Sequence, residues 1–313
     1  MTDDAFSWRD GDRRVEFGTG AAGRLAELGW DEFDLLTTAR ADPGIAPAHI
    51  VAAGGVPELA ASLLLRVVRP RLVAWGGGRV IDTAKAIVSA RGGEVCAVPT
   101  TLSGAEMTSL HRKIAGHESG RSVRPVLVLA DPGLMCSLPE PMLRASAMNA
   151  LAHGAEALYG PRANPVARLA ALRGVWLLAA GDRALGALLC AYAVDSAGYA
   201  LHHVLGQTTV RVCGTPHAET YAALLPHTMA AMLERAPEQM AELAAAVGAT
   251  SASLAARLDE LGGGTRLNLD PGQRRRVVEG ALGRSELACT PGPPVTATEL
   301  EALLEAAAAH PNL

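Results

Sequence analysis

The chain is poor in lysine and carries no excess of basic charge. Only two of its 28 basic residues are lysines, Lys85 and Lys113, and the formal net charge is -4. Phosphate backbones select proteins with clustered basic surfaces, so this charge balance argues against a nucleic acid partner. We therefore expect a small molecule to be the partner of this chain.

The sequence also lacks a long hydrophobic run and a secretory signal. Its longest apolar run, 184–194, is far below the roughly 20 residues of a membrane span and predicts a buried helix. The chain begins MTDDAFSWRDGDRR, which is acidic where a signal peptide needs a basic start. The five cysteines show no C-x-x-C spacing, which is typical of core residues in a reducing compartment. We expect a cytoplasmic protein without membrane attachment.

The pattern of apolar residues predicts two domains. From about residue 34 to 136, short runs rich in Val, Leu and Ile alternate with helical patterns, which is typical of a parallel sheet. From about residue 139 onward only helical segments follow, broken at 161, 206–216 and 290–294. We expect an α/β parallel-sheet domain at 1–136 and an all-helical domain at 137–313. The predicted strands are 34–38, 49–53, 72–75, 94–98 and 125–130, and the predicted crossover helices are 57–68 and 79–90.

The connection between the first two predicted strands is unusually short. It has about ten residues and contains Pro43 and Pro47. A parallel crossover usually needs a dozen or more residues, commonly a helix. We therefore expect the first crossover helix to be trimmed or missing.

A glycine-rich loop follows the predicted strand 72–75. Gly76, Gly77 and Gly78 open a helix that carries Asp82 and Lys85. In this position, backbone N–H groups and the helix N-terminus can approach a pyrophosphate closely. Taken alone, three glycines would fit an ordinary strand-to-helix turn equally well.

A second loop, after the predicted strand 94–98, is dense in hydroxyl groups. Thr100, Thr101 and Ser103 could bond phosphate or ribose, although by itself such a loop also fits a polar turn.

Histidines gather in the second half of the chain. Five of the nine lie between residues 153 and 227, in apolar surroundings. Burying several imidazoles without partners costs free energy, which favours a shared polar cleft over scattered core sites. A helix through Asn149 and His153 would place both on one face, because they are four positions apart. The other candidate residues are Tyr199, His202, His203 and His217.

Four segments, in order along residues 70–230, resemble the iron-containing alcohol dehydrogenase family. They are GGGRVIDTAKAI, AVPTTLSGAEMTS, DPGLMCSLPEPMLRASAMNALAHGAEALYG and TPHAETYAALLPH. The resemblance implies a dehydroquinate synthase-like fold, with a dinucleotide-binding α/β domain and an all-helical catalytic domain. Within the family the chain is most similar to the maleylacetate reductases, which have Asn at the first metal-ligand position and work without a metal.

The resemblance also implies where a metal would bind. Metal-dependent members hold iron or zinc with one Asp and three His, and the matching positions here are Asn149, His153, Tyr199 and His217. A neutral amide and a largely protonated phenol are poor ligands for a divalent cation. We therefore expect no metal.

By resemblance, the chain should reduce an unsaturated keto acid with NADH or NADPH and form a homodimer. His203 is the expected proton donor; the remaining catalytic candidates are His153, His217, Tyr199, Asn149 and His202. The expected cofactor contacts are Gly76, Gly77, Gly78, Asp82, Lys85, Thr100, Thr101 and Ser103. The trimmed crossover and a lengthened stretch between His203 and His217 leave an alternative, namely a family member that has lost redox chemistry and serves as a non-redox biosynthetic enzyme or a binding partner.

Overall fold

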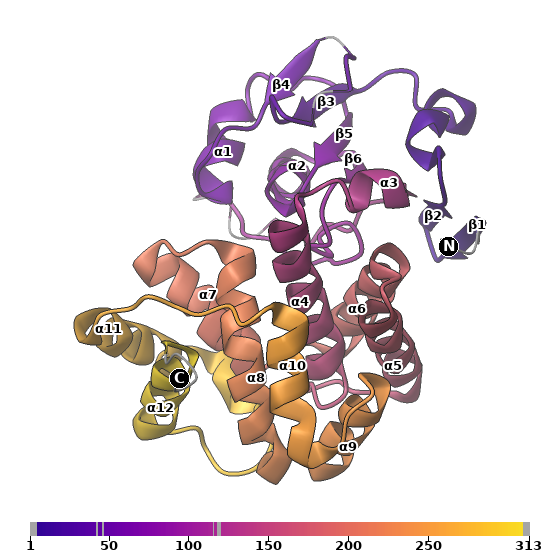
Figure 1. Ribbon diagram of the computed structural model, residues 1–313. Coiled ribbons are helices and arrows are strands. Elements are labelled where there is room, and N and C mark those ends of the chain that lie inside the picture. Colours follow the sequence, from indigo (N-terminus) through magenta and orange to yellow (C-terminus); the bar gives the residue numbers. More distant parts are fainter. Residues whose placement is uncertain (1–4, 42, 46, 115, 118–119, 309–313) are drawn as a thin grey trace. The chain divides into compact units, whose positions relative to one another are not determined.

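The computed structural model describes residues 5–41, 43–45, 47–114, 116–117 and 120–308 (Figure 1). The chain divides into two compact units, Met1–Leu138 and Pro139–Leu313. The sequence-based boundary was residue 136. The described strands all belong to the first unit, and the described elements of the second unit are helices.

The first unit is built on a seven-stranded sheet with the order β1-β2-β7-β6-β5-β3-β4. Only β1 and β2 are antiparallel, so the sheet is mixed and not purely parallel as expected. The five predicted strands correspond to β3–β7, with ends that differ by a few residues. The strands are β1 (Phe6–Asp10), β2 (Arg13–Phe17), β3 (Asp34–Thr37), β4 (Ala48–Ile50), β5 (Arg71–Gly76), β6 (Glu94–Pro99) and β7 (Leu127–Ala130).

The hairpin of β1 and β2 was not predicted. Its two-residue turn contains Gly11 with a φ of +59°, a conformation that glycine adopts without steric cost. Both strands are short and rich in charged residues, so they lack the apolar run that marks the other strands. β2 pairs with β7 in parallel and thereby extends the sheet.

Right-handed crossovers place two helices on one face of the sheet. α1 (Val56–Leu63) connects β4 to β5, and α2 (Gly78–Arg91) connects β5 to β6, so both connections cross the sheet in the same direction. They therefore cover the same face, where they pack over Leu36, Leu72 and Ala74. α1 ends earlier than the predicted 57–68, while α2 extends slightly beyond the predicted 79–90.

The connection from β3 to β4 runs in the opposite direction and therefore belongs to the opposite face. Its described residues, 38–41, 43–45 and 47, contain no helix, as the short segment predicts. Two 3-10 helices, η1 (Ala21–Arg24) and η2 (Ala26–Leu28), lie on this face instead. There Ala22 and Leu25 pack with Trp30, Leu35 and Val73.

The second unit is a helical bundle arranged around α4, which is buried along most of its length. It packs against α5, α6, α8 and α10. A short helix, α3 (Pro132–Met135), precedes it in the first unit. The helices of the second unit are α4 (Glu140–Ala157), α5 (Pro165–Ala180), α6 (Arg183–Ala197), α7 (Leu201–Cys213), α8 (His217–Arg235), α9 (Pro237–Ala246), η3 (Ser251–Ser253), α10 (Leu254–Gly262), α11 (Pro271–Leu282), η4 (Ser285–Cys289) and α12 (Ala297–Ala308).

Glycines allow the helices of the bundle to approach closely. A Cβ at Gly154 of α4 would lie 2.8 Å from the Cys190 Sγ of α6, and one at Gly186 of α6 would lie 2.8 Å from the Gly174 backbone oxygen of α5. Gly206 plays the same role inside α7, because a Cβ there would lie 2.9 Å from the Tyr221 ring. The break predicted at 206–216 is therefore wrong for its first part, since α7 continues to Cys213.

The apolar run 184–194 lies within α6, as predicted for a buried helix. Among the described residues, no single helix has the length and apolarity needed to cross a membrane. Only α6 and α7 taken together, bent by 102°, pass this test by length and composition.

Candidate functional site

Glycines bring the two predicted cofactor loops of the first unit into contact. A Cβ on Gly77 would lie 2.9 Å from Thr101 Cγ2, and one on Gly78 would lie 2.9 Å from Ser103 Oγ. Any side chain at either glycine would push the hydroxyl-rich loop away. The structure therefore brings together the residues that both motifs predicted for cofactor binding.

The N-terminus of α2 lies at the carboxyl end of β5 and has no side-chain cap at Gly77. The first N–H groups of a helix have no partner inside the helix, and the helix dipole favours negative charge there. Gly76 leaves room for Val80, whose Cγ2 would lie 2.6 Å from a Cβ at position 76. Thr100 N donates a hydrogen bond of 3.1 Å to Gly76 O and ties the second loop to the first.

Lys85 is fully buried, with 0% exposure. Its Nζ donates to Asp82 Oδ1 at 2.9 Å, to Ala105 O at 3.0 Å and to Leu110 O at 2.7 Å. The ammonium group thus fastens α2 to the segment that follows the hydroxyl-rich loop. The wholly buried Glu106 belongs to the same region, and burial raises the pKa of its carboxyl to about 7.

A lysine that contacts a bound phosphate would be at least partly exposed, whereas Lys85 is buried. The three N–H bonds of an ammonium group are matched here by three close oxygens, which leaves none for a phosphate. The predicted cofactor contact of Lys85 stays a prediction, and its observed contacts are structural. Asp82, which was also predicted to contact the cofactor, accepts a hydrogen bond from Lys85.

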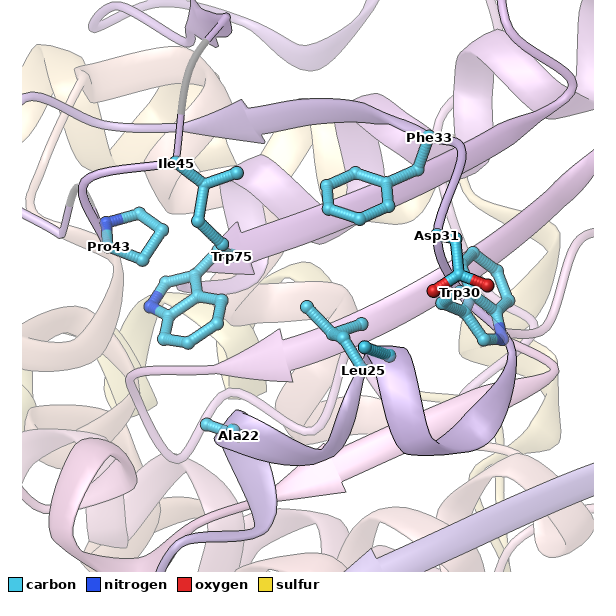
Figure 2. A pocket seen from close by; sticks show the side chains of 10 residues that line it. Ala22, Leu25, Trp30, Asp31, Phe33, Pro43, Ile45 and Trp75 are labelled. Carbon is cyan, nitrogen blue, oxygen red and sulfur yellow. The ribbon is translucent and has the colours of Figure 1, made fainter.

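A pocket of about 410 Å³ lies on the face of the sheet that η1 and η2 cover (Figure 2). Such a volume is within the range of small-molecule sites, roughly 300–1,000 Å³. Trp75, which directly precedes the glycine loop, lies at one end with Pro43 and Ile45, and Trp30 lies at the other end (Figure 2). The pocket is lined by Ala22, Gly23, Leu25, Ala26, Trp30, Asp31, Phe33, Pro43, Ile45 and Trp75.

In the second unit, a buried carboxylate holds His203. Glu156 of α4 is 0% exposed, and its Oε2 is hydrogen-bonded to His203 Nδ1. Backbone N–H groups of Ala200 and His202 donate to Glu156 Oε1 at 3.1 and 2.9 Å. Because the N-cap residue Ala200 offers no side-chain cap to α7, the carboxylate from α4 supplies that cap.

Aromatic rings surround His203. The ring of His153 stacks on it with centroids 4.8 Å apart and an interplanar angle of 18°. Tyr199 lies 5.6 Å and Tyr221 lies 5.0 Å from the His203 ring, centroid to centroid. Tyr221 in turn lies 4.5 Å from the ring of His217. The structure thus gathers His153, Tyr199, His203 and His217 in one cluster.

Burial keeps His153 neutral. Removal from water lowers its pKa well below the ordinary value, and the neighbouring His203, His217 and His202 lower it further. A neutral imidazole donates one hydrogen bond and accepts one.

Several polar atoms in and beside the cluster are buried and have no hydrogen-bond partner among the described residues. They include His203 Nε2, His153 Nδ1, His202 Nε2 and Asn149 Oδ1. Buried polar groups in native proteins are nearly always hydrogen-bonded, and leaving one unpaired costs about 1–3 kcal/mol. These atoms therefore mark a place where a substrate or an ordered water would bind.

His202 points toward a different helix. Its Nδ1 lies 2.8 Å from Thr228 Oγ1 of α8, and burial lowers its pKa well below the ordinary value. Adjacent residues on a helix differ by about 100° in direction, so the ring nitrogens of His202 and His203 bond different partners, Thr228 and Glu156. Of the two rings, the one bonded to the Glu156 carboxylate is that of His203.

Tyr199 is held by an ion pair. Its hydroxyl donates to Glu286 Oε1 at 3.2 Å and accepts from Arg284 Nη2 at 3.2 Å. Arg284 also donates to Glu286 Oε1 at 2.7 Å, and this hydrogen bond lowers the pKa of Glu286 to about 2. Burial raises the pKa of Tyr199, with a further contribution from the negative Glu286. The phenol therefore stays protonated and committed to its partners.

The four positions that resemble metal ligands do not fit a divalent cation. Asn149 supplies a neutral amide, and the Tyr199 hydroxyl is engaged by Arg284 and Glu286. In the part of the chain that the structure describes, no three or more His, Cys, Asp or Glu side chains are arranged to hold a metal ion.

The sequence analysis missed Glu156, Tyr221, Arg284 and Glu286. Glu156 had a local signal, since it is an acid in an apolar helix one turn beyond His153, and such an acid needs a partner. Arg284 and Glu286 meet Tyr199 across more than 80 residues of chain. No local sequence pattern predicts that contact.

The chain is similar to known proteins over much of its length. The family model for the C-terminal part of the Fe-containing alcohol dehydrogenase family matches residues 177–262. The maleylacetate reductase of Pseudomonas aeruginosa is 33% identical over 273 residues, which cover 75% of this chain and 78% of that protein. Maleylacetate reductase 1 of Rhodococcus opacus is 36% identical over 200 residues, covering 58% of this chain and 56% of that one.

Solved structures show the same fold. The iron-containing alcohol dehydrogenase of Corynebacterium glutamicum superposes with a TM-score of 0.84 at 28% identity, covering 100% of this chain and 98% of that chain. The maleylacetate reductase of Rhizobium sp. strain MTP-10005 gives a TM-score of 0.78 at 26% identity, covering 98% and 99%.

Replacing Lys85 by Ala should destabilise the protein. Asp82 and two backbone carbonyls would lose their donor, and leaving buried acceptors unpaired should cost about 3 kcal/mol in the free energy of unfolding. Urea unfolding would measure the loss. Lys113→Ala, at the only other lysine of the chain, is the matched control; it removes a donor to Gly120 O from a half-buried position and should cost less than Lys85→Ala. Equal losses in both variants would contradict a structural role specific to Lys85.

Proposed function

The chain belongs to the iron-containing alcohol dehydrogenase family, and we propose from this that it reduces an unsaturated keto acid such as maleylacetate with NAD(P)H and without a metal. Its similarity to maleylacetate reductases and to the family model indicates an NAD(P)H-dependent oxidoreductase. The observation that carries the proposal is the unpartnered His203 Nε2. This atom lies in a buried cluster in which Tyr199 and Asn149 take the places of metal ligands. A cytoplasmic location and a homodimer stay predictions.

The residues of the first unit suit a dinucleotide. The uncapped N-terminus of α2 offers backbone N–H groups to a pyrophosphate, and Thr101 and Ser103 place hydroxyls beside the same loop. When bound, NAD(P)H supplies a hydride to the substrate and becomes NAD(P)⁺. Trp75 connects the glycine loop with the neighbouring pocket.

The residues of the second unit supply the proton. Hydride addition to a carbon-carbon double bond beside a ketone leaves an enolate, which needs hydrogen-bond donors and then a proton. His203 Nε2 gives its proton to the adjacent carbon and recovers one from solvent. Neutral His153 and the more exposed His217 orient the substrate and stabilise its negative charge, with Asn149 one turn from His153 on α4.

Cofactor binding is the first test. We expect titration with NADPH or NADH to change tryptophan emission, because Trp75 adjoins the glycine loop, and we expect Trp75→Phe to abolish this change while binding persists. NADPH should bind at least as well as NADH, since the chain after β3 continues into exposed Arg40 with no acid to repel a 2'-phosphate. A strong preference for NADH would contradict this, and no binding of either would favour the non-redox alternative.

Turnover tests the proton donor. His203→Ala should lower kcat with maleylacetate by about 10²- to 10⁴-fold, because general acid catalysis typically raises the rate by this factor. NADPH affinity should change little. Tyr199→Phe should cost much less, since its hydroxyl is engaged by Glu286 and Arg284. If His202→Ala lost activity while His203→Ala kept it, the assignment of the two histidines would be reversed.

Metal content tests the metal-free proposal. We expect elemental analysis of the purified protein to find no stoichiometric iron or zinc, and added zinc to leave the melting temperature unchanged. Asn149→Asp combined with Tyr199→His rebuilds the donor set of the metal-dependent members, so this variant should bind zinc more tightly than the natural chain. One tightly held metal per natural chain would refute the proposal.

A further inference from the structure

Glu156 binds both the backbone at the start of α7 and the ring of His203. Its Oε1 accepts from the backbone N–H groups of Ala200 and His202 at 3.1 and 2.9 Å. Its Oε2 accepts from the backbone N–H of His203 at 3.3 Å and also meets His203 Nδ1. The backbone bonds cap α7, and the bond to Nδ1 couples the same carboxylate to the His203 ring.

The direction of the bond to the ring follows from the other bonds. Three backbone N–H groups donate to the two oxygens, and a carboxylate that accepts several such bonds is stabilised in its ionised form. An ionised carboxylate has no proton to give, so His203 Nδ1 must be the donor. The hydrogen of the neutral ring is therefore on Nδ1, and Nε2 is left as the atom without a described partner.

We propose that Glu156 is a positioning residue that fixes the His203 ring with its proton on Nδ1, so that Nε2 is the atom that transfers a proton to the substrate. The negative carboxylate also compensates the positive charge of the ring when both nitrogens carry hydrogen. When Nε2 gives its proton to the substrate carbon, the ring keeps the Nδ1 hydrogen and becomes neutral, and Nε2 is reprotonated from solvent. This inference rests on the proposed reductase function for its catalytic part only.

Glu156→Gln is the sharpest variant, because it preserves size while it reverses the bond to the ring and gives up only the 3.3 Å bond from the His203 backbone N–H to Oε2. The glutamine oxygen is needed to accept from the backbone N–H groups of Ala200 and His202, which directs its amide NH₂ toward His203 Nδ1. An NH₂ group only donates, so Nδ1 must become the acceptor and the ring hydrogen must move to Nε2. A neutral ring in that form can give a proton only by becoming an anion.

The first measurement determines which ring nitrogen of His203 carries hydrogen, and it does not require enzyme activity. In ¹⁵N-histidine NMR spectra of the full chain, the His203 signals are those that disappear in His203→Gln. We expect the wild-type ring to carry hydrogen on Nδ1, Glu156→Gln to move it to Nε2, and Tyr159→Phe to leave it on Nδ1. Tyr159 makes only a 3.5 Å contact with the Glu156 carboxylate and serves as the matched control. A wild-type ring with hydrogen on Nε2 overturns the proposal, even if no Glu156 variant folds.

The second measurement is a kinetic double-mutant cycle. Glu156→Gln should lower kcat at least about 100-fold with a smaller change in KM and NADPH affinity, and it should have almost no further effect in a His203→Gln background. A purely structural Glu156 would lower kcat by the same factor in both backgrounds, and that result would refute the proposal. If the wild type binds NADPH without reducing maleylacetate but its NMR spectra show the predicted hydrogen on Nδ1, the positioning inference stands and the proposed substrate is wrong.

Discussion

The arrangement of the second unit depends on the burial of one carboxylate. Glu156 is inaccessible to water, and a buried charge is tolerated only when its hydrogen-bonding capacity is satisfied. The start of α7 satisfies it with three backbone N–H groups and one imidazole. The same bonds determine where α7 begins, which face of α7 meets α4, and therefore which of two adjacent histidines enters the cluster. His203 faces Glu156, and His202 is left to Thr228 of α8.

The absence of anionic ligands changes the electrostatics of the cluster. A metal cation bound by an Asp and three His would keep its positive charge when buried, whereas a buried histidine can lose its proton and become neutral. Here Asn149 is neutral, Tyr199 is protonated and tied to an Arg284–Glu286 pair of no net charge, and burial keeps His153 neutral. The proposed metal-free reaction therefore relies on N–H donors to stabilise the enolate, and on the pairing of His203 with Glu156 to place the proton donor.

The sequence predicted those features that local patterns encode. The five parallel strands, both cofactor loops and the face shared by Asn149 and His153 follow from residue periodicity or from a motif. The features that it missed depend on contacts between distant segments. The buried Lys85 donates to backbone oxygens of Ala105 and Leu110. Because every residue has a backbone carbonyl, the sequence does not show which of them will bind a lysine. Glu156 finds its partners 44 to 47 residues later, and Tyr199 finds Glu286 87 residues later. The β1–β2 hairpin was missed because charged residues interrupt its apolar alternation.

The short β3–β4 connection shows how the sheet tolerates the loss of a crossover helix. A right-handed connection would have placed that helix on the face opposite α1 and α2, where Leu35, Val73 and Val98 need cover. The 3-10 helices η1 and η2 and the ring of Trp30 bury these residues instead. Such cover is thinner than a helix and leaves the pocket between Trp30 and Trp75 (Figure 2). Because Trp75 and the glycine loop are consecutive in β5 and the turn after it, the shortened connection changes the surface beside the cofactor loops without changing the loops themselves.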